Sequence, residues 1–99
     1  MGQFRQPSHI ELVDNSWECL LYEIQNPKSA IEQLLQIRFT PEQALGERVE
    51  GAKDWLELKY STGQSNDGRL YYSRIGTKTR VLVSRKADQK HDIKWLRKN

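Results

Sequence analysis

The spacing of apolar residues changes near residue 55 from a helical to a strand period. In residues 17–24 and 30–35 the apolar side chains recur three or four positions apart, which is the spacing of one face of an α-helix. Between residues 55 and 83 many of them alternate with polar residues, as expected when successive side chains point to opposite faces of a strand. The pattern therefore predicts helices in the first half of the chain and strands in the second.

Two helices joined by a short turn are predicted in the first half. Their apolar stripes are Trp17, Leu20, Leu21 and Ile24 in the first helix, and Ala30, Ile31, Leu34 and Leu35 in the second. Asn15 and Glu18 resemble a capping box at the first helix start. Asn26-Pro27 ends that helix and begins the next, because Pro suits the first helical position. Pro41 disfavours helix at the preceding residue, so we expect an antiparallel helical hairpin that ends near Phe39.

Four strands are predicted around this hairpin. They cover residues 9–13, 55–60, 69–75 and 79–84, and residues 41–54 are expected to form a loop. Residues 86–96 are expected to form a short closing helix with Ile93 and Leu96 as its apolar contacts. The order β-α-α-β-β-β-α predicts an α+β fold, with the hairpin on one face of a small, mostly antiparallel four-stranded sheet. Residues 1–99 are expected to form a single domain.

The alternation also assigns side chains to the two faces of the sheet. The residues expected to face the helices are Ile10, Leu12, Leu56, Leu58, Tyr60, Leu70, Tyr72, Val81 and Val83. The residues expected on the opposite, open face are Glu57, Lys59, Arg69, Tyr71 and Arg80, with Lys86 and Gln89 at its margin. A one-residue slip of any strand would exchange its two sets.

Charge is distributed unevenly along the chain. Residues 69–99 carry ten Lys or Arg and two Asp, a formal charge of +8, whereas residues 1–68 carry six cations and eleven acids, a charge of −5. The total of +3 therefore hides a strongly basic C-terminal third. A basic patch on a small domain favours phosphate ligands, in nucleic acid or on an anionic surface, although such a run can also be simply solvated.

Several functional classes are disfavoured by composition. No apolar run approaches the roughly 20 residues of a membrane helix, and residues 1–13 lack the apolar core of a secretory signal. The single Cys19 cannot form an internal disulfide and reads as a small core residue, which fits a cytoplasmic setting. His9 and His91 are isolated and no Cys/His cluster exists, so neither a metal site nor a cofactor is expected.

Four segments, in order, resemble the RelE/ParE superfamily of toxins from type II toxin–antitoxin modules, in its addiction-module killer (RelE/HigB-like) branch. They are residues 17–31 with their Asn-Pro-Lys turn, residues 51–60 with Trp-Leu-Glu-Leu-Lys, residues 68–72 (Gly-Arg-Leu-Tyr-Tyr), and residues 86–93 with Lys-x-x-Gln-x-x-Asp-Ile. The resemblance spans residues 9–96. It implies a RelE-like fold and a role in plasmid or module stabilisation.

The resemblance also implies an activity, namely metal-independent, ribosome-dependent cleavage of messenger RNA that inhibits translation. The 2′-hydroxyl would attack the adjacent phosphodiester, which requires a base, cations and a proton donor. Under this hypothesis Glu57 or Lys59 is the base, Arg69 the phosphate clamp and Lys86 a second cation or proton donor. Further candidate RNA contacts are Tyr71, as a stacking platform, and Arg80, Arg85, Gln89 and Lys90.

Two other functions fit the same residues. One is a ParE-like gyrase poison, which cleaves nothing itself, and the other is a diverged, non-catalytic module that binds RNA or an antitoxin. The resemblance further implies a cognate antitoxin in a hetero-oligomer. From the basic face we expect that antitoxin to present an acidic segment that covers it.

Overall fold

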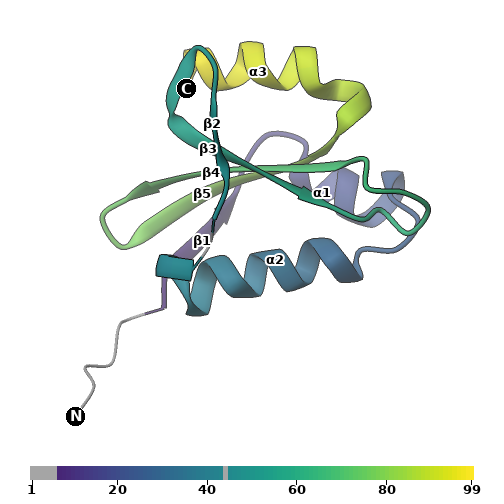
Figure 1. Ribbon diagram of the computed structural model, residues 1–99, viewed down its shortest axis with the longest axis horizontal. Coiled ribbons are helices and arrows are strands. Elements are labelled where there is room, and N and C mark those ends of the chain that lie inside the picture. The colour runs from purple at the N-terminus through teal and green to yellow at the C-terminus, as the bar shows by residue number, and fades with distance from the viewer. Residues whose placement is uncertain (1–6, 44) are drawn as a thin grey trace.

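The computed structural model describes residues 7–43 and 45–99, and within them the fold is α+β. Five strands form one sheet in the order β1-β5-β4-β3-β2, with helices on both faces (Figure 1). The strands are β1 His9–Leu12, β2 Glu47–Val49, β3 Ala52–Tyr60, β4 Gly68–Ile75 and β5 Lys78–Arg85. The helical segments are α1 Ser16–Glu18, the π-helical turn η1 Cys19–Glu23, α2 Lys28–Phe39, the 3₁₀ turns η2 Pro41–Gln43 and η3 Lys86–Asp88, and α3 Gln89–Lys98.

The sheet contains one strand more than the sequence predicted. β2 lies inside the segment expected to be a loop and pairs antiparallel with β3, with Glu47 opposite Glu57. Two of its three residues are charged, so it shows no apolar alternation, and its pairing depends on the tight turn at Gly51, where φ is +81°. β1 runs parallel to β5, so the sheet is mixed, and the prediction of four strands was wrong.

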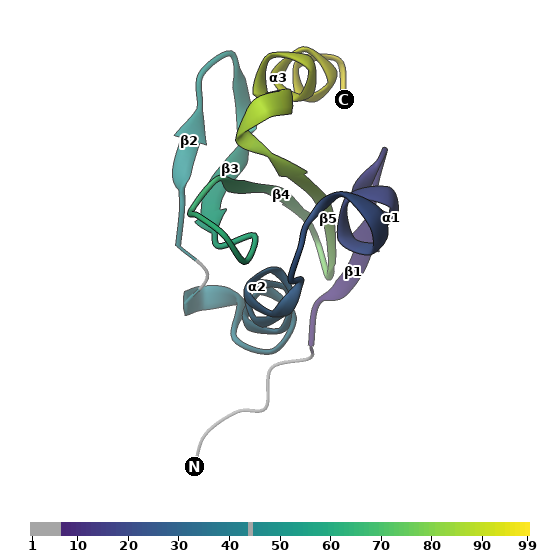
Figure 2. The ribbon, with the colours of Figure 1, turned by 90° about the vertical axis from the view of Figure 1, so that its right-hand side faces the viewer.

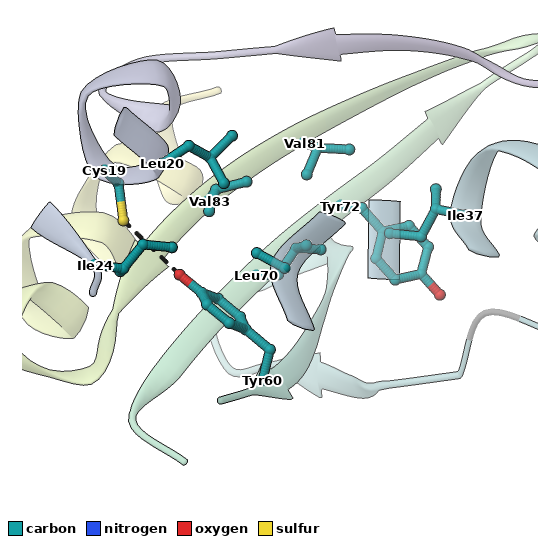
Figure 3. Close-up of a cluster of buried hydrophobic side chains, with 10 residues drawn as sticks. Cys19, Leu20, Ile24, Ile37, Tyr60, Leu70, Tyr72, Val81 and Val83 are labelled. Atoms are coloured by element: carbon teal, nitrogen blue, oxygen red, sulfur yellow. Dashed lines mark hydrogen bonds between the residues drawn. The ribbon is translucent and has the colours of Figure 1, made fainter. Parts of the chain in front are cut away.

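The assignment of side chains to the two faces of the sheet is confirmed. The cluster under α1, η1 and α2 contains Tyr60, Leu70, Tyr72, Val81 and Val83 (Figure 3). The partly buried Ile10, Leu12, Leu56 and Leu58 pack against the same cluster. Because side chains on one face recur at every second position, correct strand parity was enough to identify this core.

The predicted stripe of the first helix was wrong at two positions. Trp17 and Leu21 are 60% and 62% exposed, whereas Cys19, Leu20 and Ile24 are buried. The segment contains only a three-residue α-helix before the π-helical turn, in which the Ile24 amide donates to the Cys19 carbonyl oxygen at 3.2 Å. This wider turn rotates the apolar face away from the i, i+3, i+4 pattern.

The second helix has the predicted position and a partly different buried face. α2 ends at Phe39, as expected, and Asn26 accepts a hydrogen bond from the Lys28 amide at 3.0 Å where the helix begins. Ala30 and Ile37 are fully buried, whereas Ile31 and Leu35 are 46% and 50% exposed. The prediction that Ile31 and Leu35 face the core was therefore wrong.

Ser16 fixes the first helix to the edge of β5. Its hydroxyl oxygen accepts a hydrogen bond from the Val83 amide at 2.9 Å and lies 2.6 Å and 3.2 Å from the carbonyl oxygens of Val13 and Val81. β1 ends at Leu12, so β5 would otherwise present unpaired backbone groups at this point. The Val81 carbonyl oxygen accepts a hydrogen bond from the Val13 amide at 2.9 Å, and the fully buried Ser16 provides the partner for the Val83 amide.

α3 covers the face of the sheet that the sequence predicted to be open. Figure 2 shows α3 on the side of the sheet opposite α2. Beneath it lies a second apolar cluster of Val49, Ala52, Trp55, Tyr71, Leu82 and Leu96, with Val13, Ile93 and Trp95 at its margin. The predicted contacts of Ile93 and Leu96 are confirmed, but the basic face is covered over its centre. No helix in the described part of the chain is long and apolar enough to cross a membrane.

Candidate functional site

Four of the predicted site residues lie on adjacent strands and face the same side of the sheet. Lys59 is directly opposite Arg69, and Glu57 is directly opposite Tyr71, in the β3–β4 ladder. Directly opposite residues of an antiparallel pair have their Cβ atoms about 5 Å apart. The fold therefore brings together a carboxylate, two cations and a phenol that the sequence had placed on one face.

The first residue of α3 reaches this group. Gln89 Nε2 donates a hydrogen bond to Glu57 Oε2 at 3.0 Å. This bond joins the beginning of α3 to the middle of β3, so Gln89 braces the helix against the sheet. It also occupies one oxygen of the Glu57 carboxylate.

Arg69 is not exposed as a phosphate clamp would be. Its relative exposure is only 6%, and its Nη1 donates to the carbonyl oxygens of Asn66 at 3.1 Å and Gly68 at 2.8 Å. Its Nε is buried and, within the described part of the chain, has no hydrogen-bond partner. The guanidinium of Arg69 thus lies against the end of the β3–β4 loop, whereas Lys59, the residue directly opposite it in the ladder, is exposed.

Tyr71 lies under the start of α3, and its ring is not available to stack on a base. The residue is fully buried, and its hydroxyl hydrogen has no acceptor among the described residues. Burial raises the pKa of this hydroxyl well above its usual range, and the charges of Glu57 and Asp92 act in the same direction. The Gln89 side chain and Arg69 oppose that rise. Tyr71 is therefore a protonated donor at neutral pH.

Three of the predicted site residues are exposed lysines on β3, η3 and α3. Lys59, Lys86 and Lys90 are all exposed and take part in none of the ion pairs between described residues. Lys86 begins η3, and its amide donates to the Asp67 carbonyl oxygen at 2.7 Å, which ties η3 to the β3–β4 loop. These cations are free to meet an anionic ligand.

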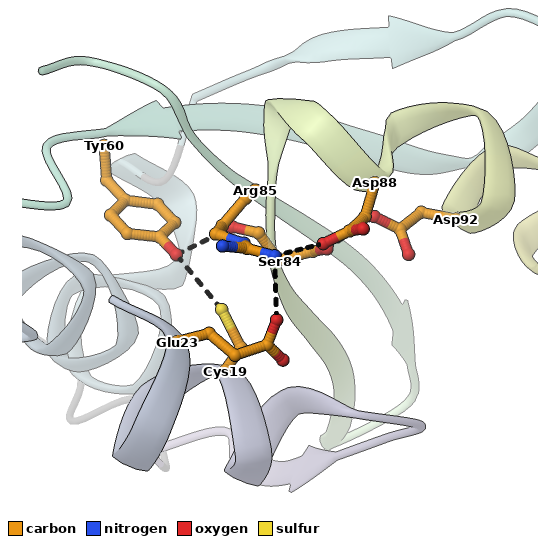
Figure 4. A network of polar contacts seen from close by, with 7 residues as sticks. All are labelled: Cys19, Glu23, Tyr60, Ser84, Arg85, Asp88 and Asp92. Atoms are coloured by element: carbon orange, nitrogen blue, oxygen red, sulfur yellow. Dashed lines mark hydrogen bonds and ion pairs between the residues drawn. The ribbon is translucent and has the colours of Figure 1, made fainter. Parts of the chain in front are cut away.

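Arg80 and Arg85 are engaged elsewhere. The Arg80 guanidinium lies 4.8 Å from the centre of the Trp55 ring, and its Nη2 donates to the Asn99 carbonyl oxygen at 2.9 Å. Arg85 points to the other face of the sheet, where its Nη2 lies 3.0 Å from Glu23 and 3.2 Å from Asp88 (Figure 4). The structure thus does not bring these two arginines together with Lys59 and Arg69.

Sequence reasoning missed the buried Asp92, which lies next to the site. Ser84 Oγ and Asp92 Oδ2 are 2.5 Å apart, and both residues are buried between β5 and α3. Burial raises the pKa of Asp92, while the Ser84 hydrogen bond opposes that rise. A signal was present, because residues 89, 92, 93 and 96 follow the i, i+3, i+4, i+7 spacing of one helix face.

The fold also brings His91, which belongs to no Cys/His cluster in the sequence, close to the carboxylates of Asp14 and Asp92. Asp14, His91 and Asp92 each place a ligand atom within 4.8 Å of the others, and His91 Nε2 lies 3.9 Å from Asp14 Oδ2. Ligand atoms that share one zinc ion lie closer, about 3.3 Å apart for bonds of 2.0 Å. His91 and Asp14 therefore stand farther apart than two ligands of one zinc ion.

The chain was compared with family models, curated proteins and solved structures. No family model, no curated protein and no solved structure matches it.

Proposed function

We propose that this chain is the toxin of a type II toxin–antitoxin module and acts as a metal-independent endoribonuclease on ribosome-bound messenger RNA. The observation that carries the proposal is the placement of Glu57, Lys59 and Arg69 side by side on one surface of β3 and β4. A carboxylate and two cations are the groups that cleavage by a 2′-hydroxyl requires. The RelE-like motifs of the sequence point to the same chemistry and to action in the cytoplasm.

The proposed reaction is a transesterification followed by release of the downstream strand. Glu57 removes the proton of the 2′-hydroxyl, whose oxygen forms a bond to the adjacent phosphorus. The bond from phosphorus to the 5′-oxygen breaks, and the ammonium of Lys86 returns a proton to that oxygen. The products are a 2′,3′-cyclic phosphate and a 5′-hydroxyl end, so protons and electrons balance.

The burial of Arg69 changes the distribution of roles among the cations. Lys59 is exposed and directly opposite Arg69, so it is the residue that contacts the phosphate. Arg69 contributes its permanent charge from beneath, where low polarity strengthens its interaction with a developing anion. Glu57 becomes available as a base when the Gln89 amide leaves its carboxylate.

We further propose a cognate antitoxin with an acidic segment that lies near Lys59 and Lys86. Unpaired exposed cations at a functional surface favour an acidic partner, and such a segment can be disordered until it binds. Binding of that segment and binding of RNA would then exclude each other. A competition titration in which the complex still binds RNA at full strength would contradict this arrangement.

The function is tested by inducing the protein briefly in bacteria and mapping transcript ends. We expect growth arrest, with new transcript ends that carry a 5′-hydroxyl, and loss of both effects in Glu57→Gln and Lys59→Ala. Each step of general acid–base catalysis contributes about 10²–10⁴-fold, so the loss should be large. Lys53→Ala is the matched control, since Lys53 is an exposed lysine at the other end of β3.

Other outcomes select between the alternatives. Trapped DNA breaks and induction of the SOS response without new transcript ends would indicate a gyrase poison. Arrest that survives Glu57→Gln and Lys59→Ala alike would place the activity on another surface. A well-expressed protein that leaves growth unaffected would show that the chain is not an active toxin.

A further inference from the structure

The hydroxyl of Tyr71 is not explained by packing. Tyr60, which is also buried, donates its hydroxyl hydrogen to the Ser84 carbonyl oxygen at 2.7 Å. Tyr71 is fully buried, but its hydroxyl hydrogen has no acceptor among the described residues, since the Gln89 amide acts on this hydroxyl only as a donor toward its oxygen. Buried polar groups are almost always hydrogen-bonded, and an exception calls for a functional or structural reason. A phenylalanine would fill the same apolar cluster, beside Leu82 and Leu96, without leaving a donor unsatisfied.

The surroundings of the hydroxyl identify the acceptor that it lacks. Glu57 is directly opposite Tyr71 in the β3–β4 ladder, and one oxygen of its carboxylate is held by Gln89 at 3.0 Å. The other nearby carboxylate, Asp92, is paired with Ser84. Of these two carboxylates, Glu57 is the one that is held by a residue of α3, Gln89. We therefore take Glu57 as the acceptor for the Tyr71 hydroxyl.

We propose that Tyr71 is a positioning residue whose hydroxyl holds the Glu57 carboxylate when Gln89 turns from Glu57 to the bound RNA. This inference rests on the proposed function. A base at the end of a flexible side chain needs a fixed donor to keep its free oxygen aimed at the 2′-hydroxyl. The Tyr71 ring has only two side-chain torsions and is fixed by the apolar cluster, so it provides such a donor. In the free protein Gln89 donates the hydrogen bond to Glu57, and the hydroxyl hydrogen of Tyr71 has no acceptor among the described residues.

The test is Tyr71→Phe, measured on ribosomes programmed with a messenger RNA. We expect the single-turnover cleavage rate to fall about tenfold or more, because misplacement of a reacting group is costly. The affinity for the programmed ribosome should stay unchanged, and the midpoint of thermal unfolding should stay unchanged or rise. Tyr22→Phe is the control, since Tyr22 is 82% exposed, and it should change none of the three quantities.

A double variant separates action through Glu57 from an independent effect. Tyr71→Phe added to Glu57→Gln should cause no further loss of rate, because the two side chains act as a unit. A tenfold additional loss in the double variant would overturn the inference. An unchanged cleavage rate in Tyr71→Phe would also overturn it. The same holds if the rate falls only because the variant binds the ribosome more weakly or unfolds at a lower temperature. Wild-type protein that cleaves no RNA would instead refute the proposed function itself.

Discussion

At the scale of single residues, Arg69 shows how burial changes the meaning of a charged side chain. The sequence predicted a phosphate clamp on an open face of the sheet. In the structure its guanidinium donates to two backbone carbonyl oxygens beneath the surface. A charged donor so placed is part of the scaffold as well as of the site.

We therefore predict that Arg69→Ala lowers the free energy of unfolding by about 1–3 kcal/mol, because it removes a charged donor from two backbone carbonyl oxygens, of which the bond to Gly68 is buried. Arg48→Ala, at an exposed position of β2, should change it by no more than about 0.5 kcal/mol. Urea denaturation of both variants measures the difference. If Arg69→Ala were as stable as the control, Arg69 would have to be more exposed in solution than it is here. Loss of activity in Arg69→Ala cannot be assigned to chemistry alone, so the exposed Lys59 is the better test of the site.

At the scale of elements, the position of α3 determines what the sheet surface can do. The helix is held by apolar contacts of Leu96 and Ile93 and by two polar links, Gln89 to Glu57 and Asp92 to Ser84. Both polar links lie in the N-terminal half of α3, above Tyr71. Access to the candidate site therefore depends on how firmly this half of the helix is docked.

The buried Asp92 gives α3 docking a specific pH dependence. Its folded-state pKa is raised above 3.8, with burial as the largest cause, so the folded state binds the proton more tightly than the unfolded state does. The contribution of Asp92 to stability is then fully present below pH 3.8 and is lost as the pH rises through its folded pKa. Hydrogen bonds from Lys78 and Thr62 lower the pKa values of Glu11 and Asp67 respectively. Their contributions to stability are therefore lost as the pH falls, opposite to that of Asp92.

We predict that Asp92→Asn gains stability relative to wild type as the pH is raised from 4, and that the difference becomes constant at neutral pH. Asparagine keeps an oxygen that can pair with Ser84 and carries no charge to bury. Subtracting the two unfolding curves at each pH removes the contributions of Glu11 and Asp67, which both proteins share. A difference that does not vary with pH would show that Asp92 is not desolvated in the folded protein.

At the scale of the whole molecule, the uneven charge distribution remains the main indication of an anionic partner. The strongly basic residues 69–99 supply the inner strands β4, apart from Gly68, and β5 and all of α3, while the acidic first 68 residues supply α1, α2 and the edge strands β1 and β2. The exposed cations Lys86 and Lys90 lie just before and within the first turn of α3, and the exposed Lys59 lies on β3, opposite Arg69. A phosphate backbone laid across them would release its bound counterions.

We predict that affinity for RNA falls linearly on a double-logarithmic plot against salt concentration, with a slope of about −0.7 for each phosphate contact. Lys59→Ala should make the slope shallower by about that amount, whereas Lys53→Ala should leave it unchanged. Fluorescence anisotropy with a short single-stranded RNA measures the slopes. A flat dependence would indicate recognition through protein surfaces, as expected for a gyrase-directed poison.

The spacing of residues along the chain was enough to predict the α+β composition, the approximate positions of α2, β3, β4, β5 and the closing helix, and which strand side chains share a face. The reason is local. Alternation along a strand follows from backbone geometry, so Tyr60, Leu70, Tyr72 and Val83 could be assigned to one core from their spacing alone. Cys19 could likewise be identified as a core residue, since it is small, apolar and set among apolar neighbours.

The tertiary structure alone decided which surfaces are covered. Which helix residues are buried depends on what lies against the helix, so Trp17, Leu21, Ile31 and Leu35 were assigned to the core but are exposed. β2 exists because β3 offers its edge and Gly51 permits the turn. The docking of α3 converted the expected open face into a covered one, because burial is decided by segments distant in sequence. Spacing could place Arg69 and Tyr71 on one face with Glu57, but only packing decided that both lie beneath the surface.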